Sequence, residues 1–219
     1  REVGLNALTI PWYLSRVHFY DHNLDGRKDL VFRNRDHYDV HIQTETGMFD
    51  PVSSPFKTDV QTGTDGPYSL AFQFSGKGDL SLVLGLRKSS THTYLRSISD
   101  INGDGIADIL THTLTGRSPL KMKSKYTIYY GTETKNGTDF TEQNRSIIFP
   151  TGKSGLGETA GYSTYWFHDF NGDNKKDLFR YDVRFGLGSI MRTLLFKTVY
   201  IDYEYYQNKN DIFRDGFCR

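Results

Sequence analysis

The sequence predicts an all-β fold, and three observations lead to this prediction. Aromatic residues make up 15% of the 219 residues, Gly occurs 21 times and Met only 3 times, a composition that favours strands and turns. Short runs of β-branched and aromatic residues alternate with turn-forming residues, and none keeps a helical period. An acidic motif also recurs between these runs. We treat residues 1–219 as a single domain.

Strands are predicted on both sides of each copy of the motif. The runs before the copies are Val17–Tyr20, Tyr94–Ile98 and Thr164–Phe167, and the runs after them are Leu30–Phe32, Ile109–Thr111 and Leu178–Tyr181. Further strands are predicted at Asp39–Ile42, Leu80–Leu84, Tyr126–Tyr130 and Thr198–Tyr203, with turns at Thr62–Pro67 and Thr132–Gly137. A short helix is expected only within Arg184–Phe196.

The acidic motif reads D-x-N-x-D-[GN]-x-x-D-[LI] at Asp21–Leu30, Asp100–Ile109 and Asp169–Leu178. A fourth segment, Ala71–Leu80, keeps only the glycine and the last Asp. The last Asp of the four segments falls at positions 29, 79, 108 and 177. A four-stranded sheet needs roughly 40–60 residues, so the interval from 79 to 108 is short. Either the degenerate copy lies inside a repeat unit or one unit is reduced.

The motif has the oxygen donors that calcium prefers, because this hard cation takes 6–8 oxygen ligands. Side-chain oxygens at positions 1, 3 and 5, the carbonyl at position 7 and the carboxylate at position 9 alternate along the loop, and glycine at position 6 permits a sharp turn. The predicted ligands are Asp21, Asn23, Asp25, the carbonyl of Arg27 and Asp29; Asp100, Asn102, Asp104, the carbonyl of Ile106 and Asp108; and Asp169, Asn171, Asp173, the carbonyl of Lys175 and Asp177. We expect about three structural calcium ions.

Other metals and the EF-hand fit this motif less well. Magnesium needs a stricter octahedron and keeps its waters, and zinc would require His or Cys ligands, which these loops lack. An EF-hand loop carries a bidentate Glu at position 12 and is flanked by helices. Position 12 is Phe32, Thr111 or Arg180 here, and the flanks are predicted strands.

The motif between strands resembles the FG-GAP/VCBS-type repeats of integrin-α-like β-propellers and of secreted bacterial proteins. The resemblance implies a calcium-binding β-propeller, with each loop joining neighbouring strands of a blade. Four copies allow four to five blades, or an arc of a larger propeller. Asn174 replaces the turn glycine of the third copy, which is a mild departure because Asn tolerates the left-handed conformation.

Three further segments have alternative interpretations. His37, Asp39 and His41 would share one face of a strand, as a metal or catalytic site or as an exposed polar face. The Gly-Lys-Ser sequence at 152–154 lacks the first glycine of a phosphate-binding loop, because position 147 is Ile. The tyrosines at 200, 203, 205 and 206 form either a sugar-stacking surface or a half-buried strand.

Charge and hydropathy limit the function classes. The net charge of +1 gives no global reason to expect nucleic acid as a partner. No apolar run is long enough to span a membrane. The start at Arg1, with no initiator Met or signal peptide, is expected for a mature product or a piece of a longer chain.

Together these features predict a calcium-stabilised binding or adhesion module with a glycan or protein ligand. Millimolar calcium outside cells would fill such sites, which predicts an extracellular, cell-surface or periplasmic location. The alternative is a polysaccharide-degrading lyase or hydrolase on the same scaffold. A His, a Tyr and an Arg that converge in a pocket away from the calcium loops would favour the enzyme. No catalytic residue is assigned from the sequence.

Overall fold

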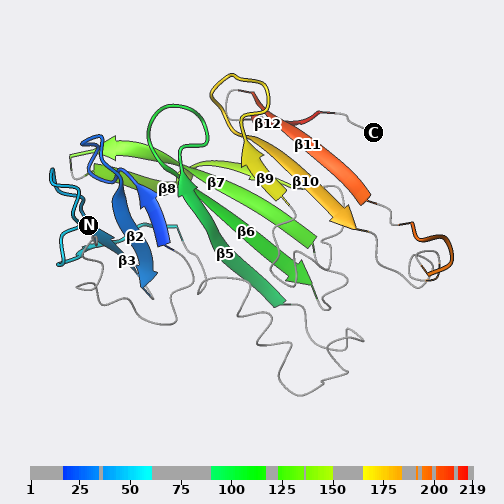
Figure 1. Cartoon of the computed structure of the whole chain (residues 1–219), viewed down its shortest axis with the longest axis horizontal. Coiled ribbons are helices and arrows are strands. Elements are labelled where there is room, and N and C mark those ends of the chain that lie inside the picture. The colour runs from blue at the N-terminus through cyan, green and yellow to red at the C-terminus, as the bar shows by residue number, and fades with distance from the viewer. Residues whose placement is uncertain are drawn as a thin grey trace, which may run out of the picture.

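The computed structural model is built from antiparallel β-sheets, which confirms the predicted all-β class (Figure 1). The structure describes residues 17–34, 37–60, 90–116, 123–135, 137–149, 165–183, 191, 194–198, 201–209 and 212–216. Among them, helical backbone occurs only at 191 and 194–196, within the segment where a short helix was expected. No helix in this part of the chain has both the length and the apolar character that a membrane span requires.

The described strands form three four-stranded sheets, each a meander of strands consecutive in the chain. The first sheet contains β1 (Val17–Tyr20), β2 (Asp29–Asn34), β3 (His37–His41) and β4 (Ser54–Phe56). The second contains β5 (Ser90–Ser99), β6 (Asp108–Gly116), β7 (Lys123–Thr134) and β8 (Gly137–Ile148). The third contains β9 (Tyr165–His168), β10 (Asp177–Val183), β11 (Ile201–Lys209) and β12 (Ile212–Gly216).

Each acidic motif occupies the same place in its sheet, namely the turn between the first and second strands. The residue before the loop pairs with the last Asp of the motif in every case: Tyr20 with Asp29, Ser99 with Asp108, and His168 with Asp177. The repeated sequence therefore corresponds to a repeated hairpin with an identical register.

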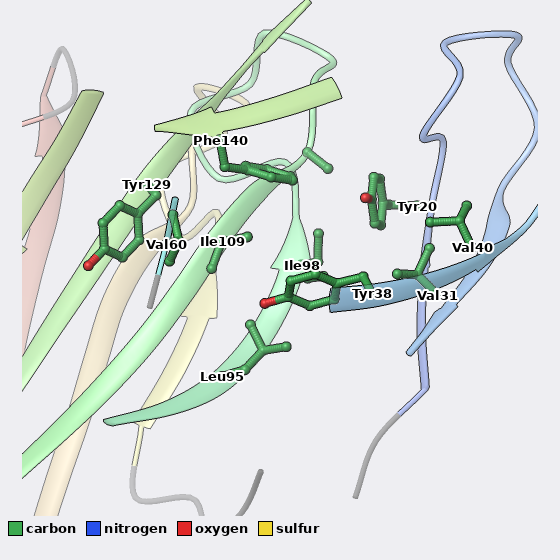
Figure 2. Close-up of a cluster of buried hydrophobic side chains, with 11 residues drawn as sticks. Tyr20, Val31, Tyr38, Val40, Val60, Leu95, Ile98, Ile109, Tyr129 and Phe140 are labelled. Carbon is green, nitrogen blue, oxygen red and sulfur yellow. The ribbon is translucent and has the colours of Figure 1, made fainter. Parts of the chain in front are cut away.

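The second sheet packs between the other two (Figure 1). Its side toward the first sheet forms one apolar cluster, which contains Ile109 of the second sheet and Val31 and Val40 of the first (Figure 2). Its opposite side forms a second cluster, in which Leu110 packs with Leu178 of the third sheet. A residue just after the last Asp of a motif thus faces the preceding sheet, and the next residue faces the following sheet.

Some elements differ from the sequence-based expectations. The stretch 132–137, predicted as a turn, contains the end of β7 and the start of β8, because the hairpin there is tight. β4, β8 and β12 were not predicted, and the strand expected at 198–203 overlaps β11, which is described from Ile201 to Lys209. The predicted strand at 80–84, the turn at 62–67 and the degenerate motif at 71–80 lie outside the described residues.

Candidate metal-binding loops and an adjoining cleft

The three acidic loops share an unusual backbone with two left-handed residues. Positions 4 and 6 have positive φ in every copy: 61° and 86° at Leu24 and Gly26, 80° and 86° at Gly103 and Gly105, and 78° and 66° at Gly172 and Asn174. Asn174 therefore adopts the left-handed conformation that its substitution for glycine required. Leu24 is less favourable there, because its Cβ crowds the backbone carbonyl oxygen at positive φ and leucine has no polar side-chain group to compensate.

Side chains at positions 1, 3 and 5 close each loop by accepting backbone N–H groups. In the first loop, Asp21 accepts from Asp25 at 3.0 Å and from Gly26 at 2.7 Å. Asn23 Oδ1 lies 3.3 Å from the same Asp25 nitrogen, and Asn23 Nδ2 donates to Asp25 Oδ2 at 2.8 Å. The oxygens of positions 1 and 3 therefore converge on one N–H group, and the third loop repeats this arrangement around the Asp173 nitrogen.

The carboxylate at position 9 has a different environment. Asp29, Asp108 and Asp177 are each fully buried at 0% exposure. One oxygen of each accepts a backbone N–H from the third strand or the segment just after it: Gln43 at 2.8 Å, Gly131 at 3.0 Å and Asn208 at 2.8 Å. The position 9 carboxylate thus ties the loop to its own sheet.

The other oxygen of this carboxylate also has a hydrogen-bond donor. It accepts from the backbone N–H of position 2 in the first two loops, and from the Tyr205 hydroxyl at 2.7 Å in the third.

Burial raises the pKa of Asp108 to about 7, against the lowering effect of its backbone donors. At position 1 of the third loop the effect of the N–H donors on the pKa is larger than the effect of burial. Burial would raise the pKa of Asp169, but its N–H donors outweigh it and lower the pKa.

The donors at positions 1, 3 and 5 fit a hard cation such as calcium, because carboxylate and amide oxygens gather within one short loop. In the described part of the chain, no group of three His, Cys, Asp or Glu side chains has a metal-holding arrangement. In these loops the donor at position 3 is Asn, and the position 9 carboxylate accepts hydrogen bonds from backbone N–H groups. Each carboxylate oxygen has a second lone pair, so position 9 can still contribute to coordination.

The loops also connect neighbouring sheets. The His22 carbonyl accepts the Thr138 N–H of the second sheet at 2.8 Å, and the Ile101 carbonyl accepts the Lys176 N–H of the third loop at 2.8 Å. A Cβ on Gly103 would lie 2.4 Å from the Asn174 carbonyl oxygen. Ordering a loop would therefore also order the contact between two sheets.

The histidine segment of β3 forms a local pair and not a cluster of three. His37 Nε2 lies 3.3 Å from Asp39 Oδ1, and Asp39 also accepts from Asn34 Nδ2 at 2.9 Å. His41 is buried, and its Nδ1 lies 2.6 Å from the Asp50 carbonyl oxygen. His41 is thus committed to a backbone contact.

The tyrosine segment divides between the two faces of the third sheet. Tyr206 is buried in the cluster against the second sheet, whereas Tyr203 is 53% exposed on the opposite face. Tyr205 donates to Asp177. Tyr200 and the Gly-Lys-Ser sequence at 152–154 lie outside the described residues.

A cleft of about 610 Å³ lies between β5, β9 and the third loop. Arg96, Tyr165 and His168 line it together with Lys176, Trp166 and Phe170. An Arg, a Tyr and a His therefore converge in one cleft, although it adjoins the third loop and is not remote from the motifs. Sequence reasoning missed this cleft. The basic residue Lys176, at position 8 of the third loop, was a charged cleft residue that the motif itself brought to attention. Nothing in the sequence indicated that Lys176 lies next to β5.

Comparison with known proteins gives no further guidance to function. No protein-family model matches this chain, and neither the curated proteins nor the solved structures contain a significant match.

Proposed function

We propose that this protein is a calcium-stabilised binding or adhesion module that acts outside the cytosol and recognises a glycan or protein ligand. The observation that carries the proposal is the threefold repetition of one acidic loop at one position of three sheets. The copies share side-chain donors, two left-handed residues and a hairpin register. Turn formation alone does not require three acidic side chains in each copy.

The finer fold that we propose is a β-propeller, or an arc of one, with each sheet as a blade of the FG-GAP/VCBS type. Consecutive four-stranded meanders that pack face to face support this assignment. The same loop between the first two strands of every sheet supports it as well.

Calcium would be structural in this protein. Asp21, Asn23 and Asp25, with their counterparts in the other loops, would hold the ion, and the carbonyls of Arg27, Ile106 and Lys175 would complete the set. Bound calcium offsets the repulsion between neighbouring carboxylates, and it stabilises the folded state through linkage. Extracellular calcium of about 1 mM suits sites with a Kd of about 10⁻⁴–10⁻³ M, which supports an exported protein.

A lyase acting on acidic polysaccharides is the second candidate. It is favoured by one observation, that Arg96, Tyr165 and His168 line the same cleft. A lyase needs a base for the proton next to the carboxylate and a cation to stabilise the charge that develops. Absorbance of unsaturated products would reveal this activity.

Thermal unfolding with calcium and with chelator tests the calcium proposal. We expect a higher Tm in about 1 mM calcium. Asp104→Ala, which removes a donor from the second loop, should lower the Tm in calcium more than in chelator. Asp139→Ala is a matched control, because this Asp lies outside the motifs. Equal melting temperatures of the unmutated protein with calcium and with chelator would overturn the proposal.

A further inference from the structure

We propose that the cleft between β5 and β9 binds an acidic saccharide, with Lys176 and Arg96 facing its carboxylate or sulfate groups and Trp166 and Phe170 stacking on its sugar rings. This inference rests on the proposed binding function and names a ligand class and a site for it. The cleft volume of about 610 Å³ is in the range of small-molecule sites.

The charged side chains that line the cleft are basic. Arg96 and Lys176 line the cleft, and no Asp or Glu is among its described lining residues. Lys176 Nζ donates to Ser99 Oγ at 3.1 Å, which holds the ammonium group at the cleft wall. The Lys176 side chain is partly buried. An anionic ligand would replace part of the hydration that burial removes from this ammonium group.

Arg96 is positioned by an irregularity in β5. The pairing of β5 with β6 shifts between Leu95 and Ser97, so Arg96 is the extra residue of a β-bulge. The bulge lets the consecutive residues Arg96 and Ser97 both line the cleft, whereas regular strand residues alternate between faces. Bulges often re-aim a side chain beside a functional site.

The Arg96 side chain is held in place before any ligand arrives. It is only 4% exposed, and Nη2 lies 2.8 Å from His112 Nδ1. The guanidinium lies 5.7 Å from the centre of the Tyr165 ring. His112 is in turn stacked on Tyr126, with 4.5 Å between ring centres. A cation fixed in this way pays little ordering entropy when it binds an anion.

Two exposed aromatic residues, Trp166 and Phe170, also line the cleft. Their rings pack on Phe179, on the face of the third sheet turned away from the second, so they would contact a ligand that extends over the edge of β9. Trp166 is 53% exposed and Phe170 is 50% exposed, so both rings are accessible to a ligand. Phe179 supports both, stacked on Trp166 at 5.7 Å and tilted against Phe170 at 6.0 Å. Rigid aromatic faces beside hydrogen-bonding groups suit ligands with one apolar and one polar side, such as sugar rings.

These features favour a saccharide over a nucleic acid. The chain has a net charge of only +1, whereas nucleic-acid binding relies on many basic contacts along the phosphate backbone. The two cleft cations instead match isolated acidic groups on an otherwise uncharged ligand.

Calorimetric titration of the full chain in calcium-containing buffer tests the proposal. The probes are a hyaluronan hexasaccharide for carboxylate, a carrageenan hexasaccharide for sulfate, cellohexaose as the neutral sugar, and a single-stranded DNA oligonucleotide. A Trp12→Phe background makes Trp166 the only indole, because the chain has two Trp residues. Its fluorescence then reports occupancy of this cleft. We expect an acidic hexasaccharide to bind and to change this fluorescence.

Variants separate charge from stacking. Lys176→Gln should weaken binding of the acidic probe by about tenfold or more, because hydrogen bonds to charged groups are strong. Lys57→Gln is the control: Lys57 is an exposed lysine just after β4 in the first sheet, and it does not line the cleft. Its affinity should stay within about twofold of the unmutated protein. Trp166→Ala should weaken binding of acidic and neutral probes alike.

Several results would overturn the inference. They are no binding of either acidic probe, tighter binding of cellohexaose or DNA, or equal effects of Lys176→Gln and Lys57→Gln. Failure of the calcium proposal is distinguishable, because it appears as an unchanged Tm with chelator and leaves saccharide titrations interpretable. Unsaturated products would support the cleft assignment and favour the lyase over the binding module.

Discussion

The second and third sheets share their strand order, their acidic loop and their hairpin register, but they differ in burial. The second sheet is covered on both faces by apolar clusters. The third is covered on one face, and its other face exposes Trp166 and Tyr203 at 53% each. Equivalent positions show this directly, since Leu110 is 1% exposed and Phe179 is only half-buried. The repeated sequence determines the local geometry of each sheet, whereas the neighbouring sheets determine whether each of its faces is buried or exposed.

The largest expected effect tests this difference in burial. Leu110→Ala should lower the free energy of unfolding by about 2–5 kcal/mol, because it leaves a cavity between two sheets. Phe179→Ala should cost less, about 1–2 kcal/mol, since part of the ring is already in contact with water. Urea unfolding measures both. Equal losses would mean that the Phe179 face is buried in solution by something other than the described residues.

The second prediction concerns the charge buried in the middle sheet. A carboxyl whose folded pKa is raised stabilises the fold only while it is protonated. Because burial raises the pKa of Asp108 to about 7 from an ordinary value of 3.8, calcium-free stability should fall as the pH rises from about 4 to 7. Urea midpoints across this range should show that slope.

Two variants isolate the contribution of Asp108 to that slope. Asp108→Asn cannot ionise and should flatten it, whereas Asp104→Asn should only reduce it, because the Asp104 charge is one of several contributions to the raised pKa of Asp108. Calcium should also reduce the slope, since the cation favours the ionised carboxylate. A slope that persists unchanged in Asp108→Asn would show that another group is responsible.

The smallest expected change in stability comes from substitutions at position 4 of the first two loops. Leu24→Gly should stabilise the protein by up to about 1 kcal/mol, because it relieves the strain of a φ of 61°. Gly103→Ala should destabilise it, since its Cβ would approach the Asn174 carbonyl oxygen at 2.4 Å. The Tm shifts should have opposite signs. A loss of stability in Leu24→Gly would mean that the Leu24 side chain contributes packing that outweighs the strain.

Much of the local structure could be predicted from the sequence, because it depends on short-range chemistry. Acidic and amide side chains close a turn by accepting nearby N–H groups, so the three loops and their flanking strands follow from the motif. The left-handed conformation of Asn174 was also predictable. That of Leu24 was not, because leucine gives no signal for positive φ.

Features that depend on distant partners could not be predicted. Asp29, Asp108 and Asp177 were assigned as metal ligands from spacing alone, yet each is buried against an N–H group at least 14 positions away in the chain. The bulge at Arg96 depends on the register between β5 and β6, which leaves no periodic trace in the sequence. The cleft joins β5 to β9, and only the packing of two sheets brings them together.

Direct counting of bound calcium tests the central claim that the three acidic loops hold divalent ions. Native mass spectrometry in calcium should show about three ions per chain. Asp21→Ala, Asp104→Ala and Asp173→Ala should each remove one ion. Magnesium at the same concentration should be retained less well. A chain that carries no calcium at millimolar concentration, or variants that bind as many ions as the unmutated protein, would contradict the account.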